Sequence, residues 1–153
     1  MRNYLIVDLD GTLCDNSHRQ HLALAKQWDE FHSLLHEDKL CNEVVAVIRG
    51  LSAVVPDLHV VAVTGRNERY RGKTLEWKRQ QGVHHLFDDL LMRPDDDYTK
   101  DEVLKIKMIE DYFGGSKERV LSKVLLALDD HNSVVNAFRD YGIIVFQVRE
   151  GDF

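Results

Sequence analysis

The chain has 153 residues, of which 44% are hydrophobic and 30% are charged, and its formal net charge is −6 at pH 7. This length fits one domain with a substantial core, so we expect residues 1–153 to form a single domain. The acidic balance excludes a surface coated in basic residues for long polyanions. Because no apolar run approaches the roughly 20 residues of a membrane span and no secretory signal is present, we expect a cytoplasmic protein with no membrane partner.

Short apolar runs alternate with stretches of helical period along the chain. The runs predict strands at 4–8, 59–64, 89–92, 124–129 and 143–148. The periodic stretches between them predict helices at 42–55, 67–81, 100–113 and 132–140. Continuous apolar strands separated by helices are typical of parallel sheets. We therefore expect an α/β fold with a central parallel sheet of about five strands and helices on both faces.

Residues 16–41 do not fit this alternation, because they are too long for an ordinary connection between a strand and a helix. We expect them to form a small helical cap insertion over the sheet edge. Within it, Trp28 and Phe31 either pack as a small core or, in the case of Trp28, stack on a nucleobase. His32 and His36 are four residues apart, which fits either a solvated face or part of a zinc site.

Residues capable of chemistry lie where four of the predicted strands end. They are Asp8 and Asp10 at the first, Thr64, Gly65 and Arg66 at the second, Arg93 at the third, and Asp129 and Asp130 at the fourth. An aspartate at one strand end is equally typical of a turn. However, the carboxyl ends of parallel strands meet at one edge, where ligands bind in open sheets. Four such segments together therefore predict a single crevice.

The composition of this crevice indicates a metal and a phosphoryl group. Carboxylates within ~4 Å of one another repel by about 4 kcal/mol per pair at an effective dielectric constant of 20, so they need a cation. Oxygen-rich ligation favours Mg²⁺. The Thr64 hydroxyl, the Gly65 amide and the guanidiniums of Arg66 and Arg93 are donors suited to phosphate oxygens. The sequence therefore predicts phosphoryl transfer with one carboxylate as nucleophile.

Four ordered motifs carry a resemblance that spans nearly the whole chain. DLDGT at 8–12, VTGR at 63–66, a lysine on the helix near 100–113 and LDD at 128–130 resemble the motifs of the haloacid dehalogenase (HAD) superfamily. The resemblance extends to the phosphatase domain of phage and bacterial polynucleotide kinase-phosphatases. That narrower likeness rests on Arg19, LLMRP at 90–94, KDEVLK at 100–105, DDHNSVVNAFRDYGI at 129–143 and FQVREGDF at 146–153.

The resemblance implies roles for the carboxylates. Asp8 would be the nucleophile that forms an aspartyl-phosphate, and Asp10 would be a protonated acid that becomes the base in the second step. Asp8, Asp129 and the main-chain carbonyl of Asp10 would hold Mg²⁺, with Asp130 completing the acidic cluster.

The resemblance also implies roles for the donors around the phosphoryl group. Thr64 would hydrogen-bond this group, and Lys105 would neutralise both the nucleophile and the phosphate. Lys107, two residues further on and on another face of the helix, is a competitor for this role, and the likeness of KDEVLK favours Lys105. The substrate-binding residues would be Arg19, Gly65, Arg66 and Arg93.

The function implied by the resemblance is a Mg²⁺-dependent polynucleotide 3′-phosphatase that repairs nucleic acid ends. The basic stretch at 66–79 either meets the nucleic acid backbone or is simply an exposed helix face. Because the chain contains no G-x-x-x-x-G-K-[ST] loop, we expect a separately encoded polynucleotide kinase or ligase as a partner.

Two other functions remain open from the sequence. A phosphatase of free nucleotides or other small phosphomonoesters is favoured by the negative charge. A receiver-like phosphoacceptor module would also place acidic residues on a parallel sheet. Its phosphoacceptor would follow the third strand, where this chain has Met92 and Arg93.

Overall fold

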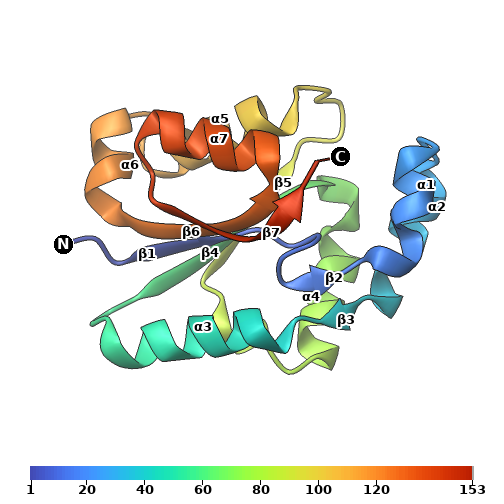
Figure 1. Cartoon of the computed structure of the whole chain (residues 1–153), viewed down its shortest axis with the longest axis horizontal. Coiled ribbons are helices and arrows are strands. Elements are labelled where there is room, and N and C mark those ends of the chain that lie inside the picture. The colour runs from blue at the N-terminus through green and yellow to red at the C-terminus, as the bar shows by residue number, and fades with distance from the viewer. Residues whose placement is uncertain (153) are drawn as a thin grey trace.

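The computed structural model describes residues 1–152 and contains a five-stranded parallel sheet in the order β5-β4-β1-β6-β7 (Figure 1). The strands are β1 (Tyr4–Val7), β4 (His59–Asn67), β5 (Asp89–Arg93), β6 (Val124–His131) and β7 (Val145–Gly151). The predicted α/β fold with about five parallel strands is confirmed. Phe153, the last residue of the FQVREGDF motif, lies outside the described residues.

Helices cover both faces of the sheet, as predicted (Figure 1). On one face, α3 (Asn42–Val54) and α4 (Arg71–Gln80) pack on a core that includes Leu5, Val7 and Trp77. On the other face, α5 (Asp101–Tyr112), α6 (Lys117–Lys123) and α7 (Asn132–Tyr141) pack on Ile6 and Val61. The alternation of Leu5, Ile6 and Val7 between the two cores is the ordinary two-residue period of a strand that is buried on both sides.

Two features of these elements were not predicted. Helix α6 is short, and its only sequence signal is Ser116, whose side chain accepts a hydrogen bond from the Arg119 amide as an N-cap. Strand β4 continues past Thr64 to Asn67, because Asn67 still pairs with Arg93 of β5 across an irregularity in register. This extension carries Gly65 and Arg66 along β4 through the irregularity in its pairing with β5.

Residues 16–41, hereafter the cap segment, form a largely helical insertion between β1 and α3. It contains η1 (Ser17–Arg19), α1 (Gln20–Leu24), α2 (Trp28–Ser33) and η2 (Leu35–Glu37). It is closed at its base by an antiparallel pair that was not predicted, β2 (Cys14–Asp15) with β3 (Lys39–Leu40). Helices α1 and α2 lie beyond the end of the sheet at which the first-strand aspartates follow β1 (Figure 1). The cap segment therefore stands over the predicted crevice.

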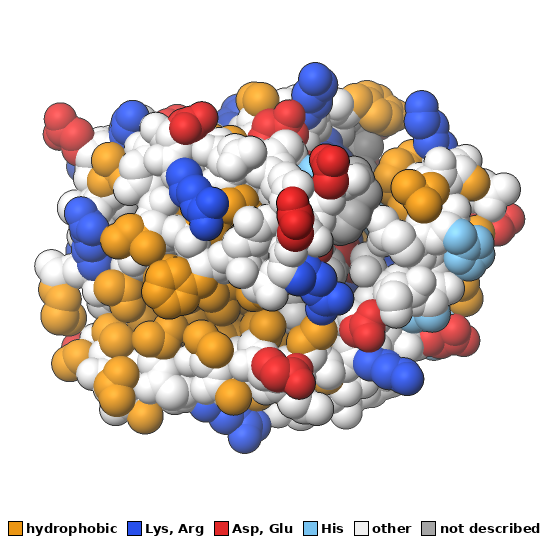
Figure 2. Space-filling model, viewed as in Figure 1, with side chains coloured by type: hydrophobic (Ala, Val, Ile, Leu, Met, Phe, Trp, Pro, Cys, Tyr) orange, Lys and Arg blue, Asp and Glu red, His pale blue; other side chains and the backbone are white. Residues whose placement is uncertain are grey.

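The surface has no extended basic field on the face seen in Figure 2, where Lys and Arg side chains are scattered among Asp and Glu side chains. Hydrophobic side chains gather on the same face (Figure 2). Phe146 of the edge strand β7 is one of the exposed hydrophobic residues of the described chain. Within residues 1–152 no helix combines the length and the apolar character that crossing a bilayer requires.

Candidate active site

The floor of the site is formed where β1 and β6 end beside α5. Lys105 donates hydrogen bonds from Nζ to Asp8 Oδ1 at 2.8 Å and to Asp129 Oδ2 at 2.9 Å. The Thr12 hydroxyl donates to Asp8 Oδ2 at 3.0 Å. All four side chains are buried. The structure thus brings Lys105 to the acidic pair, whereas Lys107 is exposed on another face of the helix.

Asp130 completes a cluster of three carboxylates. One oxygen from each of Asp8, Asp129 and Asp130 lies within 4.8 Å of the others. Burial, followed by the nearby Asp129, raises the pKa of Asp8 well above its usual value, although Lys105 opposes this effect. Burial also raises the pKa of Asp130. Three carboxylates thus share a single lysine, and in the absence of a further cation their burial disfavours the charged forms of Asp8 and Asp130.

These three carboxylates fit a hard divalent cation. Asp130 Oδ2 is buried without a hydrogen-bond partner among the described residues, which is costly for a carboxylate oxygen. Gly11 has φ of +85°, and a Cβ at that position would lie 2.0 Å from the same oxygen. The loop after β1 therefore approaches this oxygen as closely as only glycine permits. An oxygen-only donor set with an unsatisfied carboxylate is the kind of site that Mg²⁺ occupies.

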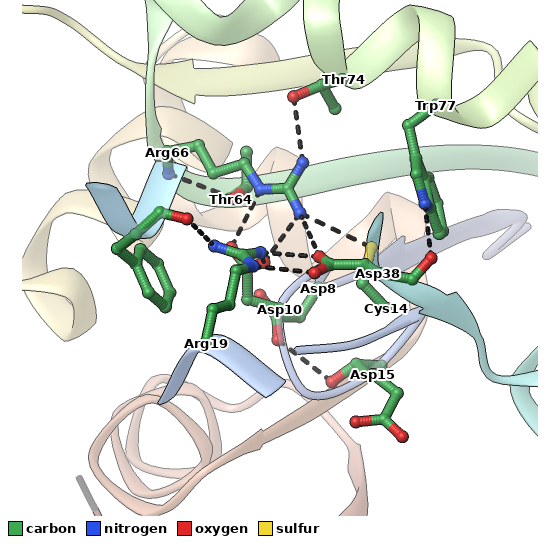
Figure 3. A network of polar contacts seen from close by, with 12 residues as sticks. Asp8, Asp10, Cys14, Asp15, Arg19, Asp38, Thr64, Arg66, Thr74 and Trp77 are labelled. Atoms are coloured by element: carbon green, nitrogen blue, oxygen red, sulfur yellow. Dashed lines mark hydrogen bonds and ion pairs between the residues drawn. The ribbon is translucent and has the colours of Figure 1, made fainter. Parts of the chain in front are cut away.

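Asp10 is held by two arginines (Figure 3). Arg19 Nη2 donates to Asp10 Oδ1 at 2.6 Å, and Arg66 donates to the two Asp10 oxygens from Nη2 at 2.7 Å and from Nε at 3.0 Å. Burial favours the neutral acid, but the charge of Arg66 and then that of Arg19 outweigh it and lower the pKa of Asp10. In the free site the two arginines therefore favour the ionised form of Asp10, whereas the proton-donor role expected for it requires the protonated form.

Asp38 is the second carboxylate of this arrangement, and it was missed by the sequence reading. It accepts hydrogen bonds from Arg19 Nε at 2.7 Å and Nη2 at 2.6 Å, and it lies 3.4 Å from Arg66 Nη2. Its carbonyl accepts a hydrogen bond from Trp77 Nε1 at 2.9 Å. Two arginines and two aspartates, with Arg19, Arg66 and Asp38 fully buried, thus form a neutral network that ties the cap segment to β4 and α4 (Figure 3). We call these four residues the clamp.

The predicted residues Gly65 and Arg93 lie at one wall of the site. Arg93 donates from Nε to the Gly65 carbonyl at 2.9 Å and from Nη1 to the Thr99 carbonyl at 2.6 Å, and it forms an ion pair with Asp101. A Cβ at Gly65 would lie 2.6 Å from Asp101 Oδ1. Asp101 was also missed; it precedes Lys105 by one helical turn. Most donors of Arg93 are therefore occupied in holding the loop before α5.

A cavity of about 430 Å³ joins these parts. Its lining includes the reactive candidates Asp8, Asp10, Thr64, Gly65, Arg66, Arg93, Lys105 and Asp130. Arg19, a fully buried residue of the clamp, is not part of this lining, and its guanidinium stacks on Phe31 at 4.1 Å. The Thr64 hydroxyl accepts a hydrogen bond from the Arg66 amide at 3.1 Å. The cavity has the size of a small-ligand site.

The basic stretch at 66–79 does not form an open phosphate-binding face. Arg66 and Lys78 are buried, and Arg71 and Arg79 form ion pairs with glutamates three residues away. Apart from Arg66, Arg69 is the only basic residue of this stretch that lines the cavity. The whole stretch therefore does not present its charges to a nucleic acid backbone, since two of its basic side chains are buried and two others are paired.

The two histidines of the cap segment behave differently from one another. His32 is buried against Tyr70, so the solvated face predicted for it is wrong, whereas His36 is exposed. Desolvation lowers the pKa of His32 to about 4. Among the described residues, the candidate metal-ligand cluster consists of Asp8, Asp129 and Asp130 and includes neither histidine. Cys14 is buried, which raises its thiol pKa and fits a packing role.

Comparisons with known proteins agree with this geometry. The family model described as "Polynucleotide kinase PNKP phosphatase domain" matches residues 2–153. A protein of Autographa californica nuclear polyhedrosis virus named "Putative bifunctional polynucleotide kinase/RNA ligase" is 28% identical over 149 residues, which cover 94% of this chain and 19% of the viral protein. The chain therefore corresponds to a small part of that relative.

Solved structures show the same fold. A structure titled "Structure of Pnkp1/Rnl/Hen1 complex" matches with a TM-score of 0.80 and 28% identity, over 100% of this chain and 48% of the other chain. A hydrolase from Streptococcus pneumoniae TIGR4 matches with a TM-score of 0.63 at 14% identity, over 97% of this chain and 94% of the other, which supports the fold alone. The protein belongs to the family of polynucleotide kinase PNKP phosphatase domains and is a phosphatase of the HAD superfamily.

Proposed function

We propose that this phosphatase is Mg²⁺-dependent and removes 3′-phosphates from nucleic acid ends through an aspartyl-phosphate on Asp8. The observation that carries the proposal is that one cavity holds two carboxylates whose surroundings differ in charge. Asp8 belongs to a buried cluster short of positive charge, whereas Asp10, two residues away, belongs to the neutral clamp. The family match to polynucleotide kinase phosphatase domains supports the choice of substrate.

In the first step, an Asp8 oxygen attacks phosphorus as the bond from phosphorus to the 3′-oxygen breaks. Lys105, which already contacts Asp8 Oδ1, offsets the negative charge of the nucleophile and of the phosphoryl group. Asp8, Asp129 and the main-chain carbonyl of Asp10 would hold Mg²⁺, with Asp130 completing the acidic site. The bound ion supplies charge stabilisation to the phosphoryl oxygens.

Asp10 is the candidate for proton transfer. Its carboxyl would give a proton to the departing 3′-oxygen and would then accept one from the water that hydrolyses the aspartyl-phosphate. In the free site this carboxylate is ionised by its two arginine partners. A phosphoryl group competes for the same guanidinium donors, so substrate binding favours the protonated form of Asp10. Arg66 is the clamp arginine that lines the cavity, so it would grip the phosphate.

Nucleic acid contacts outside the cavity should be few. Arg69 is the remaining cavity-lining base of the 66–79 stretch, and the net charge of the chain is −6. Each phosphate contact adds roughly 0.7 to 0.9 to the slope of log affinity against log salt. We therefore expect a slope near −1 and little dependence on sequence.

The relatives suggest where this activity works. The viral relative is named as a kinase and ligase, and the solved Pnkp1 structure is titled as a complex with Rnl and Hen1. We therefore expect a polynucleotide kinase and an RNA ligase to act on the same ends as this phosphatase.

The test compares kcat/KM for four substrates: an oligonucleotide 3′-phosphate, a 3′-mononucleotide, a 5′-mononucleotide and an aryl phosphate. The oligonucleotide 3′-phosphate should be preferred, and activity should disappear after metal stripping and return with Mg²⁺. A preference for 5′-mononucleotides would favour a nucleotidase instead. Full turnover in excess EDTA after stripping would contradict the metal requirement.

A further inference from the structure

An aromatic column stands at the mouth of the cavity. The His32 ring stacks on Tyr70 with centroids 4.4 Å apart and planes at 27°, and Trp28 continues the column 6.5 Å from His32 at 29°. Trp28 and His32 both line the cavity that holds Asp8 and Asp10. Because Trp28 is 52% exposed whereas His32 is 7% exposed, the column is buried at its centre and open at its Trp28 end.

Trp28 is held in a fixed orientation without being part of the cap core. Phe31 is the buried aromatic residue of α2, and its ring meets Trp28 edge-on at 5.7 Å with planes at 90°. Contacts with Phe31 and His32 thus fix the indole plane while half of the side chain stays in solvent. A ring fixed in advance loses little conformational entropy when a flat ligand stacks on it.

A second, independent observation points to a ligand beside this column. His32 Nδ1 is buried and has no hydrogen-bond partner within residues 1–152. An unpaired buried nitrogen costs free energy unless something else bonds to it. Since His32 lines the cavity that contains the reactive carboxylates, a ligand bound there can supply the missing partner.

We propose that this column is the subsite for the nucleoside that carries the scissile phosphate, with its base stacked on Trp28. The inference rests on the proposed function, because it assumes that the phosphate belongs to a nucleotide end. Stacking tolerates every base, since each has a π-face, so the subsite recognises a nucleobase without reading sequence. It also gives an acidic protein affinity for nucleic acid that does not depend on phosphate contacts.

The kinetic test uses two oligonucleotide 3′-phosphates that differ only in whether the 3′-terminal residue carries its base. Trp28→Ala should lower kcat/KM for the base-bearing substrate roughly 5- to 100-fold and leave the abasic substrate nearly unchanged, whereas Trp28→Phe should keep most of the activity. Phe146→Ala is the matched control, because Phe146 is 60% exposed and does not line the cavity. Equal losses on both substrates, or no loss, would overturn the proposal.

A binding measurement gives a readout that does not depend on turnover. The chain has two tryptophans, and Trp77 is 1% exposed, so solvent-exposed indole emission comes from Trp28. In an Asp8→Asn background, titration with the base-bearing oligonucleotide should quench this emission. The quenching should disappear in Trp28→Phe and with the abasic oligonucleotide. Unchanged emission at saturating ligand would overturn the proposal.

These outcomes separate the subsite from the proposed function. Poor turnover of every oligonucleotide 3′-phosphate by the wild type would contradict the proposed function, and the subsite with it. Good turnover that is equal with and without the terminal base would leave the proposed function intact and overturn only the stacking subsite.

Discussion

Asp38→Asn tests whether the clamp holds the cap segment in place. The substitution keeps the size of the side chain and one acceptor oxygen, but it removes the negative charge that faces Arg19 at 2.6 and 2.7 Å and Arg66 at 3.4 Å. The clamp then has two arginines and one aspartate, so one buried positive charge lacks a partner. Breaking a buried pair in this way typically costs 3–5 kcal/mol, so we expect a loss of about 3–5 kcal/mol in unfolding free energy.

Chemical denaturation measures this loss directly, and thermal unfolding should show a fall in Tm of roughly 6 to 20 °C for a chain of this length. Asp57→Asn is a suitable control, because Asp57 is exposed and asparagine tolerates its φ of 53°. A double-mutant cycle of Asp38→Asn with Arg19→Gln should show coupling above 1 kcal/mol. If Asp38→Asn cost less than 1 kcal/mol, or if the two changes were simply additive, the clamp would not be a stabilising unit.

Three further predictions concern the nucleophile, the lysine and the buried histidine. Asp8→Asn should reduce turnover at least 100-fold, and hydrolysis of a substrate made chiral at phosphorus should proceed with net retention, because each of two in-line displacements inverts the phosphorus; net inversion would favour direct attack by water. Lys105→Ala should lower kcat/KM at least 100-fold because Asp8 and Asp129 lose their counter-charge, whereas the exposed Lys107→Ala should change it less than twofold; equal effects would contradict this assignment. Because burial lowers the pKa of His32 to about 4, the unfolded chain binds a proton near pH 6.5 before the folded chain does, and stability falls as the pH drops from 6.5 to 4. Denaturation curves at pH 6.5 and pH 4 should show that the loss of unfolding free energy between these pH values is about 2–3 kcal/mol smaller in His32→Phe than in the wild type. Identical losses in the two proteins would contradict the assignment of this pH dependence to His32.

The sheet and the floor of the site were predictable because both depend on local pattern. Apolar runs such as 124–129 identify buried strands, and parallel strands bring their carboxyl ends to one edge whatever lies between them. The convergence of Asp8, Thr64 and Asp129 therefore follows from strand order alone. The choice of Lys105 over Lys107 rested on the KDEVLK likeness, and helical geometry added only that residues two apart face different directions.

The clamp was not predictable from pattern. Asp38 lies in the short polar stretch HEDK, and its partner Arg19 is 19 positions earlier with no repeating spacing between them. Such pairs depend on how the cap segment folds back over the sheet, and the helix and strand preferences of neighbouring residues do not predict this. The prediction of a basic face at 66–79 was inaccurate for a related reason, because a dense run of basic residues does not show that Arg66 and Lys78 are buried.

The distribution of charge in the site predicts an order of binding. The floor has three carboxylates, Asp8, Asp129 and Asp130, against the single ammonium of Lys105, which leaves a formal charge of −2, whereas the clamp is neutral. A phosphate dianion entering such a site without a cation meets net repulsion, so the metal should bind first. Calorimetric titration with inorganic phosphate should show binding in the presence of Mg²⁺, and the affinity should fall at least tenfold after metal stripping. Asp130→Asn removes one of the three negative charges, so it should reduce the ratio between the phosphate affinities measured with and without Mg²⁺. Equal phosphate affinity with and without Mg²⁺ would mean that the arginine side of the cavity, rather than the acidic floor, governs entry of the substrate.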